Sequence, residues 1–121
     1  MGGQIKLSIR KLVEARDEAC WHCAKTDGLQ VHHRRGRGMG GVKGKAADAA
    51  NSPQNLIRVC ADYNYLMESN ARVAARARGW GHKLSTWDDT SLPVFDCATF
   101  TWYVLTHEGE KVEVSFQDDA W

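Results

Sequence analysis

The fold of this chain is decided by LQVHHRRGRGMGG at residues 29–41 and NLIRVCADYN at residues 55–64. The first stretch is a short apolar run that ends in two adjacent histidines and passes into a glycine-rich, basic loop. The second is an apolar run that leads into a helix. Short apolar runs bounded by turn residues predict two strands, LQVHH from Leu29 and NLIRVC. We therefore expect two strands joined by a long loop and followed by a helix.

Helices are predicted on both sides of these strands. In residues 5–19, apolar residues recur near helical spacing, at Ile5, Ile9, Leu12 and Val13. After the second strand, a long helix is expected from about Ala61 to Arg78, with Gly79 as its C-cap. Residues 1–83 thus form the first predicted unit of the chain.

The final third of the chain is predicted to be β-rich. Residues 92–116, LPVFDCATFTWYVLTHEGEKVEVSF, contain runs typical of strands, and HEGE predicts a hairpin turn between Leu105 and Val112. STWDDTS at residues 85–91 is a plausible linker. The expected class is α+β: a two-strand and helix core with an N-terminal helix, and a C-terminal antiparallel hairpin or small sheet over residues 84–121 packed on it.

The length and composition fit one globular domain. The chain has 121 residues, 43% of them hydrophobic and 26% charged. No apolar run approaches the roughly 18 residues that a membrane-spanning helix needs. The N-terminus also lacks the apolar segment of a secretory signal. We therefore expect a cytoplasmic protein with no membrane partner.

The net charge of +1 hides an uneven distribution along the chain. Residues 1–83 hold fifteen Lys and Arg against seven Asp and Glu, whereas residues 84–121 hold one against eight. A basic body favours a polyanionic partner such as nucleic acid. The acidic end allows two interpretations: a solvated surface, or a segment that folds back on the basic part or contacts a partner.

Four cysteines are present: Cys20, Cys23, Cys60 and Cys97. Without a secretory signal, a set of disulfides is not expected. Cys20 and Cys23, in CWHC, have the spacing that binds zinc at a turn. A redox role for this pair is the weaker interpretation, because no βαβ pattern follows it.

Residues 15–80 resemble the HNH endonuclease family, which has the ββα-metal fold, and in particular the small HNH proteins of tailed phages. The resemblance rests on ARDEACWHC, VHHRRGRGMGG, NSPQNLIRVC and the helix opening NYLMESN, which occur in the family's order. It implies a metal-dependent endonuclease that hydrolyses phosphodiester bonds of double-stranded DNA in the cytoplasm of a host cell. Some phage relatives act with the DNA-packaging terminase, so the terminase or another packaging protein is an expected partner.

The resemblance assigns roles to two histidines and an asparagine. His32 would bind the divalent ion, and His33 would be the general base that takes a proton from the attacking water. Asn55 would hydrogen-bond backbone groups on both sides of the long loop. Consecutive strand side chains point to opposite sides, so both histidines serve one site only if the strand ends and bends there.

Asn64 stands where many family members have a metal-binding histidine, and relatives with asparagine use its carbonyl oxygen. Glu68 shares its helix face and could supply a further contact. Oxygen ligands favour Mg²⁺ or Mn²⁺ over Ni²⁺ or Zn²⁺. Asn70 also replaces a histidine that is common in phage relatives. An alternative therefore stays open, an HNH-fold protein with weakened catalysis that binds DNA or a partner protein.

Basic residues beside the histidines and on the helix are expected to contact the DNA backbone. Those in the loop and on the helix are Arg34, Arg35, Arg37, Lys43, Lys45, Arg72 and Arg76.

A structural zinc site is the last candidate. Family members often have a second CxxC just before the helix, but here Cys60 is followed at the partner position by Tyr63. Cys20, Cys23 and Cys60 are therefore three candidate ligands for a site that needs four. Cys97 or His22 could complete it. Alternatively, the site is degenerate and the three cysteines pack as small hydrophobic residues.

Overall fold

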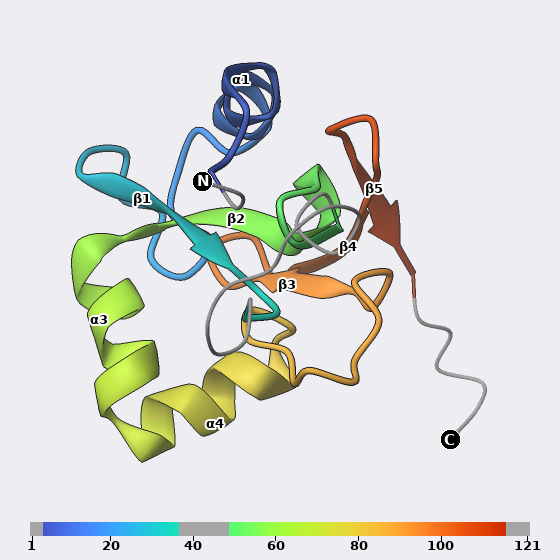
Figure 1. Cartoon of the computed structure of the whole chain (residues 1–121). Coiled ribbons are helices and arrows are strands. Elements are labelled where there is room, and N and C mark those ends of the chain that lie inside the picture. The colour runs from blue at the N-terminus through green and yellow to red at the C-terminus, as the bar shows by residue number, and fades with distance from the viewer. Residues whose placement is uncertain (1–3, 37–48, 116–121) are drawn as a thin grey trace.

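The structure, a computed structural model, describes residues 4–36 and 49–115 and has the predicted α+β class (Figure 1). Within these residues it contains three α-helices, one 3₁₀ turn and two small antiparallel sheets. No helix among them is long and apolar enough to cross a bilayer. In chain order the elements are α1 (Leu7–Arg16), β1 (Leu29–His33), η1 (Pro53–Asn55), β2 (Leu56–Cys60), α3 (Ala61–Ser69), α4 (Ala71–Gly79), β3 (Val94–Asp96), β4 (Thr101–Leu105) and β5 (Lys111–Val114).

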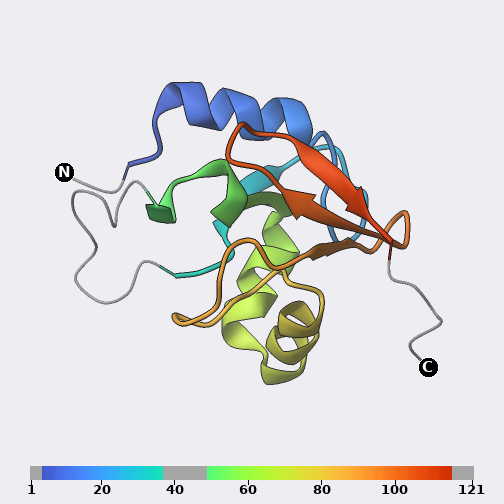
Figure 2. The ribbon, with the colours of Figure 1, turned by 90° about the vertical axis from the view of Figure 1, so that its right-hand side faces the viewer.

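The first sheet is the predicted pair of strands. β1 and β2 run antiparallel, with Leu29 opposite Cys60 and His33 opposite Leu56. α3 starts directly after β2, and the Sγ atom of Cys60 caps it by accepting a hydrogen bond from the Tyr63 N–H at 3.5 Å. In both views the two strands lie between α1 on one side and α3 with α4 on the other (Figures 1 and 2). The strand pair is thus covered on both faces.

The single helix predicted over Ala61–Arg78 is wrong, because the chain breaks into α3 and α4 at Asn70. The backbone of Asn70 is extended (φ −127°, ψ 118°), and its Oδ1 accepts hydrogen bonds from the N–H groups of Arg72 and Val73. An asparagine side chain that caps a new helix competes with continuation of the old one. The predicted C-cap at Gly79 is wrong: α4 includes Gly79, and its C-cap is Trp80. The glycine with positive φ that follows this helix is Gly81.

The second sheet has the strand order β3–β4–β5, and the predicted hairpin turn joins β4 to β5. Gly109 in this turn has φ +89°, and a Cβ there would lie 2.9 Å from Cβ of Leu12, so the turn packs closely on α1. Val94 and Leu105 of this sheet share one core cluster with Ile57 and Met67. The basic part and the acidic part of the chain, which meet near residue 83, therefore share one hydrophobic core.

Candidate functional site

His32 is buried on the side of β1 that faces α3. Its side chain is 6% exposed, and its Nε2 lies 2.9 Å from the backbone oxygen of His82. A carbonyl only accepts, so the proton is on Nε2 and the lone pair of the neutral ring is on Nδ1. Burial lowers the pKa of His32 to about 4. The ring is therefore neutral at pH 7, the form that a metal ligand requires.

Two α3 residues face the same side of β1. The Nδ2 of Asn64 donates to Oε1 of Gln30 at 2.7 Å. Gln30 and His32 share a strand face, and two residue steps along a strand span about 6.6 Å. Asn64 and Glu68 are likewise about 6 Å apart along the helix. Glu68 is therefore on the Asn64 side of α3, and its negative charge acts to raise the pKa of the His32 ring.

Lys83 is also near this face, although the sequence analysis did not single it out. Its Nζ lies 3.2 Å from Oε1 of Glu68, and its positive charge is one cause of the low pKa of His32. The Glu68 carboxylate is mostly exposed, so this ion pair contributes little to stability. It shows that a cation is accommodated beside Glu68.

His33 ends β1, and its ring has a partner on another segment. Nε2 of His33 lies 2.8 Å from Oδ1 of Asn51, a buried residue just before η1. Because an amide oxygen accepts, this bond puts the proton on Nε2 and the lone pair on Nδ1. The chain bends at Arg34, directly after the strand. Both histidines lie within β1, ahead of this bend, so their side chains point to opposite sides of the strand. Accordingly, the His33 ring bonds to Asn51 and the His32 ring to the His82 backbone.

Asn55 is fully buried and ties together the two ends of the long loop. Its Oδ1 accepts from the Arg35 N–H at 2.7 Å, and its Nδ2 donates to the carbonyls of Arg35 at 2.9 Å and Ala50 at 2.8 Å. These are the hydrogen bonds on both sides of the loop that the sequence predicts. Asn55 is a positioning residue for the end of β1, and its effect on catalysis stays a prediction.

Arg34 does not lie where a DNA-contacting residue would. Its side chain is 1% exposed, and burial lowers the pKa of its guanidinium to about 10. Four backbone carbonyls, at 2.8 to 3.0 Å, accept its N–H groups: those of Gly81, Gln54, Thr90 and Leu92. The prediction of DNA contact is therefore wrong for this residue, which instead holds distant segments together.

The other predicted DNA-binding residues have varied positions. Arg35 is half-buried, and its guanidinium donates to the Asp88 carbonyl at 3.1 Å. Arg72 and Arg76 are exposed on α4. Arg37, Lys43 and Lys45 lie outside the described residues.

A buried polar network that the sequence analysis missed supports His32. His82 is 0% exposed, and its Nε2 donates to the Phe95 carbonyl at 2.6 Å. Its Nδ1 accepts from the Tyr63 hydroxyl, also at 2.6 Å. Burial lowers the pKa of His82 to about 4, so this ring is neutral too. The residue whose carbonyl orients His32 is thus itself fixed at both ring nitrogens.

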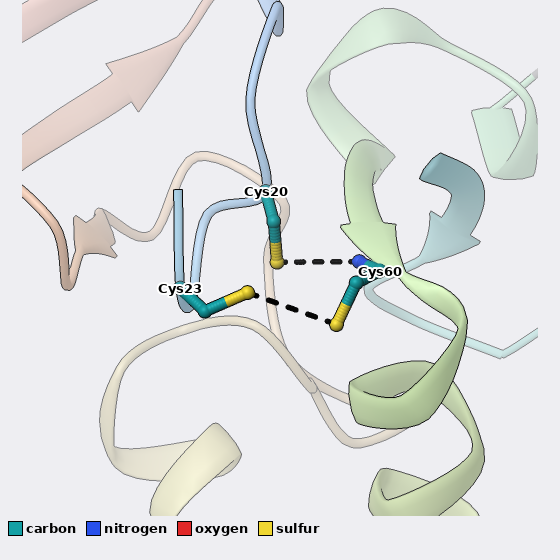
Figure 3. A group of neighbouring side chains, drawn as sticks. All are labelled: Cys20, Cys23 and Cys60. Carbon is teal, nitrogen blue, oxygen red and sulfur yellow. Dashed lines mark hydrogen bonds between the residues drawn. The ribbon is translucent and has the colours of Figure 1, made fainter. Parts of the chain in front are cut away.

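Three cysteines form a second group that can hold a metal ion. The Sγ atoms of Cys20, Cys23 and Cys60 all lie within 4.8 Å of one another, and they point toward a common space (Figure 3). Cys20 and Cys60 are buried, as small hydrophobic residues would be, but Cys23 is exposed. Packing alone therefore does not account for the position of Cys23.

Comparisons of the chain with protein-family profiles, curated proteins and solved structures find no match. Function is therefore inferred from the side chains and their arrangement. Three of them had no signal in the sequence: Asn51, His82 and Lys83 act through contacts with residues 15 or more positions away.

Proposed function

We propose that this protein is a metal-dependent HNH endonuclease that hydrolyses phosphodiester bonds in double-stranded DNA. The observation that carries the proposal is the bond from Asn64 of α3 to Gln30, which shares a strand face with His32. In the proposed site Nδ1 of His32, Oδ1 of Asn64 and the Glu68 carboxylate would bind the ion. One nitrogen and two oxygen donors suit Mg²⁺ or Mn²⁺ better than a softer ion. The order of two antiparallel strands and a helix, β1, β2 and α3, is the order expected of a ββα-metal fold and supports the proposal.

His33 is proposed as the general base. Its hydrogen bond to Asn51 sets the tautomer whose Nδ1 lone pair can take a proton from water as the water attacks phosphorus. His32 is held by the His82 carbonyl with its own Nδ1 lone pair available for ligation. When bound, a divalent ion neutralises charge on the phosphate and on the departing oxygen.

Exposed cations would hold the DNA backbone. Arg72 and Arg76 lie one helical turn apart on α4 and are proposed to contact phosphates together with Arg35. The same role is proposed for Arg37, Lys43 and Lys45. A terminase or another phage packaging protein is the proposed protein partner, on the resemblance alone.

A plasmid-nicking assay tests this function. Supercoiled DNA is incubated with the protein and EDTA, Mg²⁺, Mn²⁺, Ni²⁺ or Zn²⁺ in separate reactions. We expect nicked product with Mg²⁺ or Mn²⁺ and none with EDTA. Intact plasmid in every reaction would contradict the proposal.

The contact between Lys83 and Glu68 favours a second function, an HNH fold with weakened catalysis that binds DNA. The ammonium group stands 3.2 Å from a proposed ligand atom and competes with a metal ion for it. This function predicts salt-sensitive retention on DNA without cleavage. Cleavage gained by Asn64→His, or by Lys83→Met, would show that the metal site limits activity.

We further propose that Cys20, Cys23 and Cys60 bind structural Zn²⁺. The Cys23 and Cys60 sulfur atoms are 3.8 Å apart, and Zn–S bonds of about 2.3 Å place tetrahedral ligands about 3.8 Å apart. Backbone N–H groups also point at the sulfur of Cys20, from Cys60 at 3.2 Å and His22 at 3.3 Å. Such donors favour a thiolate, the form that binds metal, and oppose the burial that raises the pKa of the Cys20 thiol to about 11.

A further inference from the structure

The three clustered thiols leave one position of a tetrahedral zinc site without a ligand. The residue three positions after Cys60 is Tyr63, and its hydroxyl is already bonded to His82 at 2.6 Å. The ring of His22 is stacked flat on the ring of Tyr63, with centroids 4.0 Å apart and 4° between the planes. The Tyr63 hydroxyl is therefore already engaged, whereas the stacking holds the His22 ring in place without using its nitrogens.

Cys97 is the remaining thiol, and the fold brings it beside the cluster from the C-terminal sheet. It directly follows β3, and its backbone N–H donates to the Trp21 carbonyl at 3.0 Å. Trp21 lies between Cys20 and Cys23 in the sequence, so this bond fixes Cys97 against the turn that presents both thiols.

We propose that Cys97 is the fourth ligand of a tetrahedral, four-thiolate zinc site, and that the ion fastens the acidic C-terminal sheet to the β1–β2 core. The inference rests on the proposed zinc site at the other three cysteines. Cys97 lies outside the group of thiols within 4.8 Å of one another, so ligation requires its sulfur atom to move toward them. Each ligating cysteine releases its proton to solvent and binds as a thiolate.

The site has a structural consequence for the chain. Three of its ligands come from the turn after α1 and from the end of β2, whereas the fourth comes from the turn between β3 and β4. A metal ion that joins Cys60 to Cys97 closes the loop between them, and this lowers the conformational entropy of the unfolded chain. The ion therefore stabilises the contact between the two charge-separated parts, in addition to the core that they share.

Cobalt substitution of the full chain tests the fourth ligand. Co²⁺ is added to metal-free wild type, Cys97→Ser and Cys23→Ser, and the thiolate-to-cobalt absorption band is recorded. We expect Cys97→Ser to lose about a quarter of the band, as a site with three thiolates instead of four should, and to bind Zn²⁺ at least about tenfold more weakly. An unchanged band and affinity in Cys97→Ser, with loss in Cys23→Ser, would overturn the role of Cys97 and leave the three-cysteine zinc site standing.

A second measurement needs no variant. Wild type is alkylated with iodoacetamide with and without Zn²⁺, and the modified cysteines are mapped by mass spectrometry. Protection of Cys97 along with the other three supports the proposal, and full alkylation of Cys97 in the zinc-loaded protein contradicts it. Failure of wild type to take up Zn²⁺ or Co²⁺ would overturn both zinc proposals, and the nicking assay would still decide the nuclease separately.

Discussion

The Nε2 atom of His32 donates a hydrogen bond to the backbone oxygen of His82 across 2.9 Å, which joins the end of β1 to the segment after α4. This bond decides which nitrogen of His32 can bind a metal ion. It also places two buried, neutral histidines next to each other in the centre of the molecule.

The stability of the protein is expected to fall in mild acid because of these histidines. Burial lowers the pKa values of His32 and His82 from 6.5 to about 4. Below about pH 6.5 the unfolded chain binds protons that the folded chain does not bind until about pH 4. The full contribution of these two histidines to the free energy of unfolding is therefore present above pH 6.5. It declines by up to about 1.4 kcal/mol per pH unit for each histidine as the pH falls to about 4.

Urea unfolding between pH 7.5 and pH 4.5 measures this decline. His107 is exposed, so His107→Gln should leave the pH dependence unchanged. A free energy of unfolding that stays constant across this range would contradict the buried, neutral state of His32 and His82.

Arg34→Lys is expected to lower the free energy of unfolding by about 3 kcal/mol or more. A single ammonium group cannot reach the four carbonyls that the guanidinium binds, and it leaves buried acceptors without donors. Arg72→Lys, on the exposed face of α4, should cost less than about 0.5 kcal/mol. Equal urea midpoints for the two variants would show that Arg34 is not structural.

Asn55→Ala is expected to cost about 3 kcal/mol of stability and to slow plasmid nicking about tenfold to a hundredfold. The change removes three hydrogen bonds that hold the residues after His33 and before η1. Gln54→Ala is the matched control, because only the backbone oxygen of Gln54 is used by Arg34. If the two variants nick DNA equally fast, Asn55 does not position the end of β1.

Tyr63→Phe is expected to lower the free energy of unfolding by about 1–3 kcal/mol. The change removes only a hydroxyl, yet it leaves Nδ1 of the buried His82 without its donor. Tyr65 is 70% exposed on the same helix, and Tyr65→Phe should be close to neutral. The difference between the two thermal melting temperatures measures the effect, and no difference would rule out the network.

The parts of the fold that could be predicted are those set by local sequence. LQVHH and NLIRVC are short apolar runs between turn residues, and both are strands in the structure. Gly109 likewise marks the hairpin turn. The break at Asn70 could not be predicted in the same way, because the apolar spacing continues through it from Met67 to Val73. The capping bonds of its side chain end one helix and start the next.

The candidate site was predictable only where residue type and order carry the signal. His32, His33 and Asn55 stand at the ends of the loop, as their spacing suggests. Arg34 could not be told from its exposed neighbours by sequence, because its burial depends on carbonyls as far as 58 residues away. His82 is likewise defined by contacts from β1, α3 and β3, which no local pattern records.

The central claim is that His33 acts as the base of a metal-dependent nuclease. It is tested most directly by comparing the rate of supercoiled-plasmid nicking by wild type, His33→Ala and the exposed-site control His107→Ala in Mg²⁺ and Mn²⁺. We predict that wild type and His107→Ala nick at the same rate, and that His33→Ala is inactive while it still binds DNA. Equal nicking by His33→Ala and wild type would contradict the assignment of His33 as the base, and with it the proposed nuclease site.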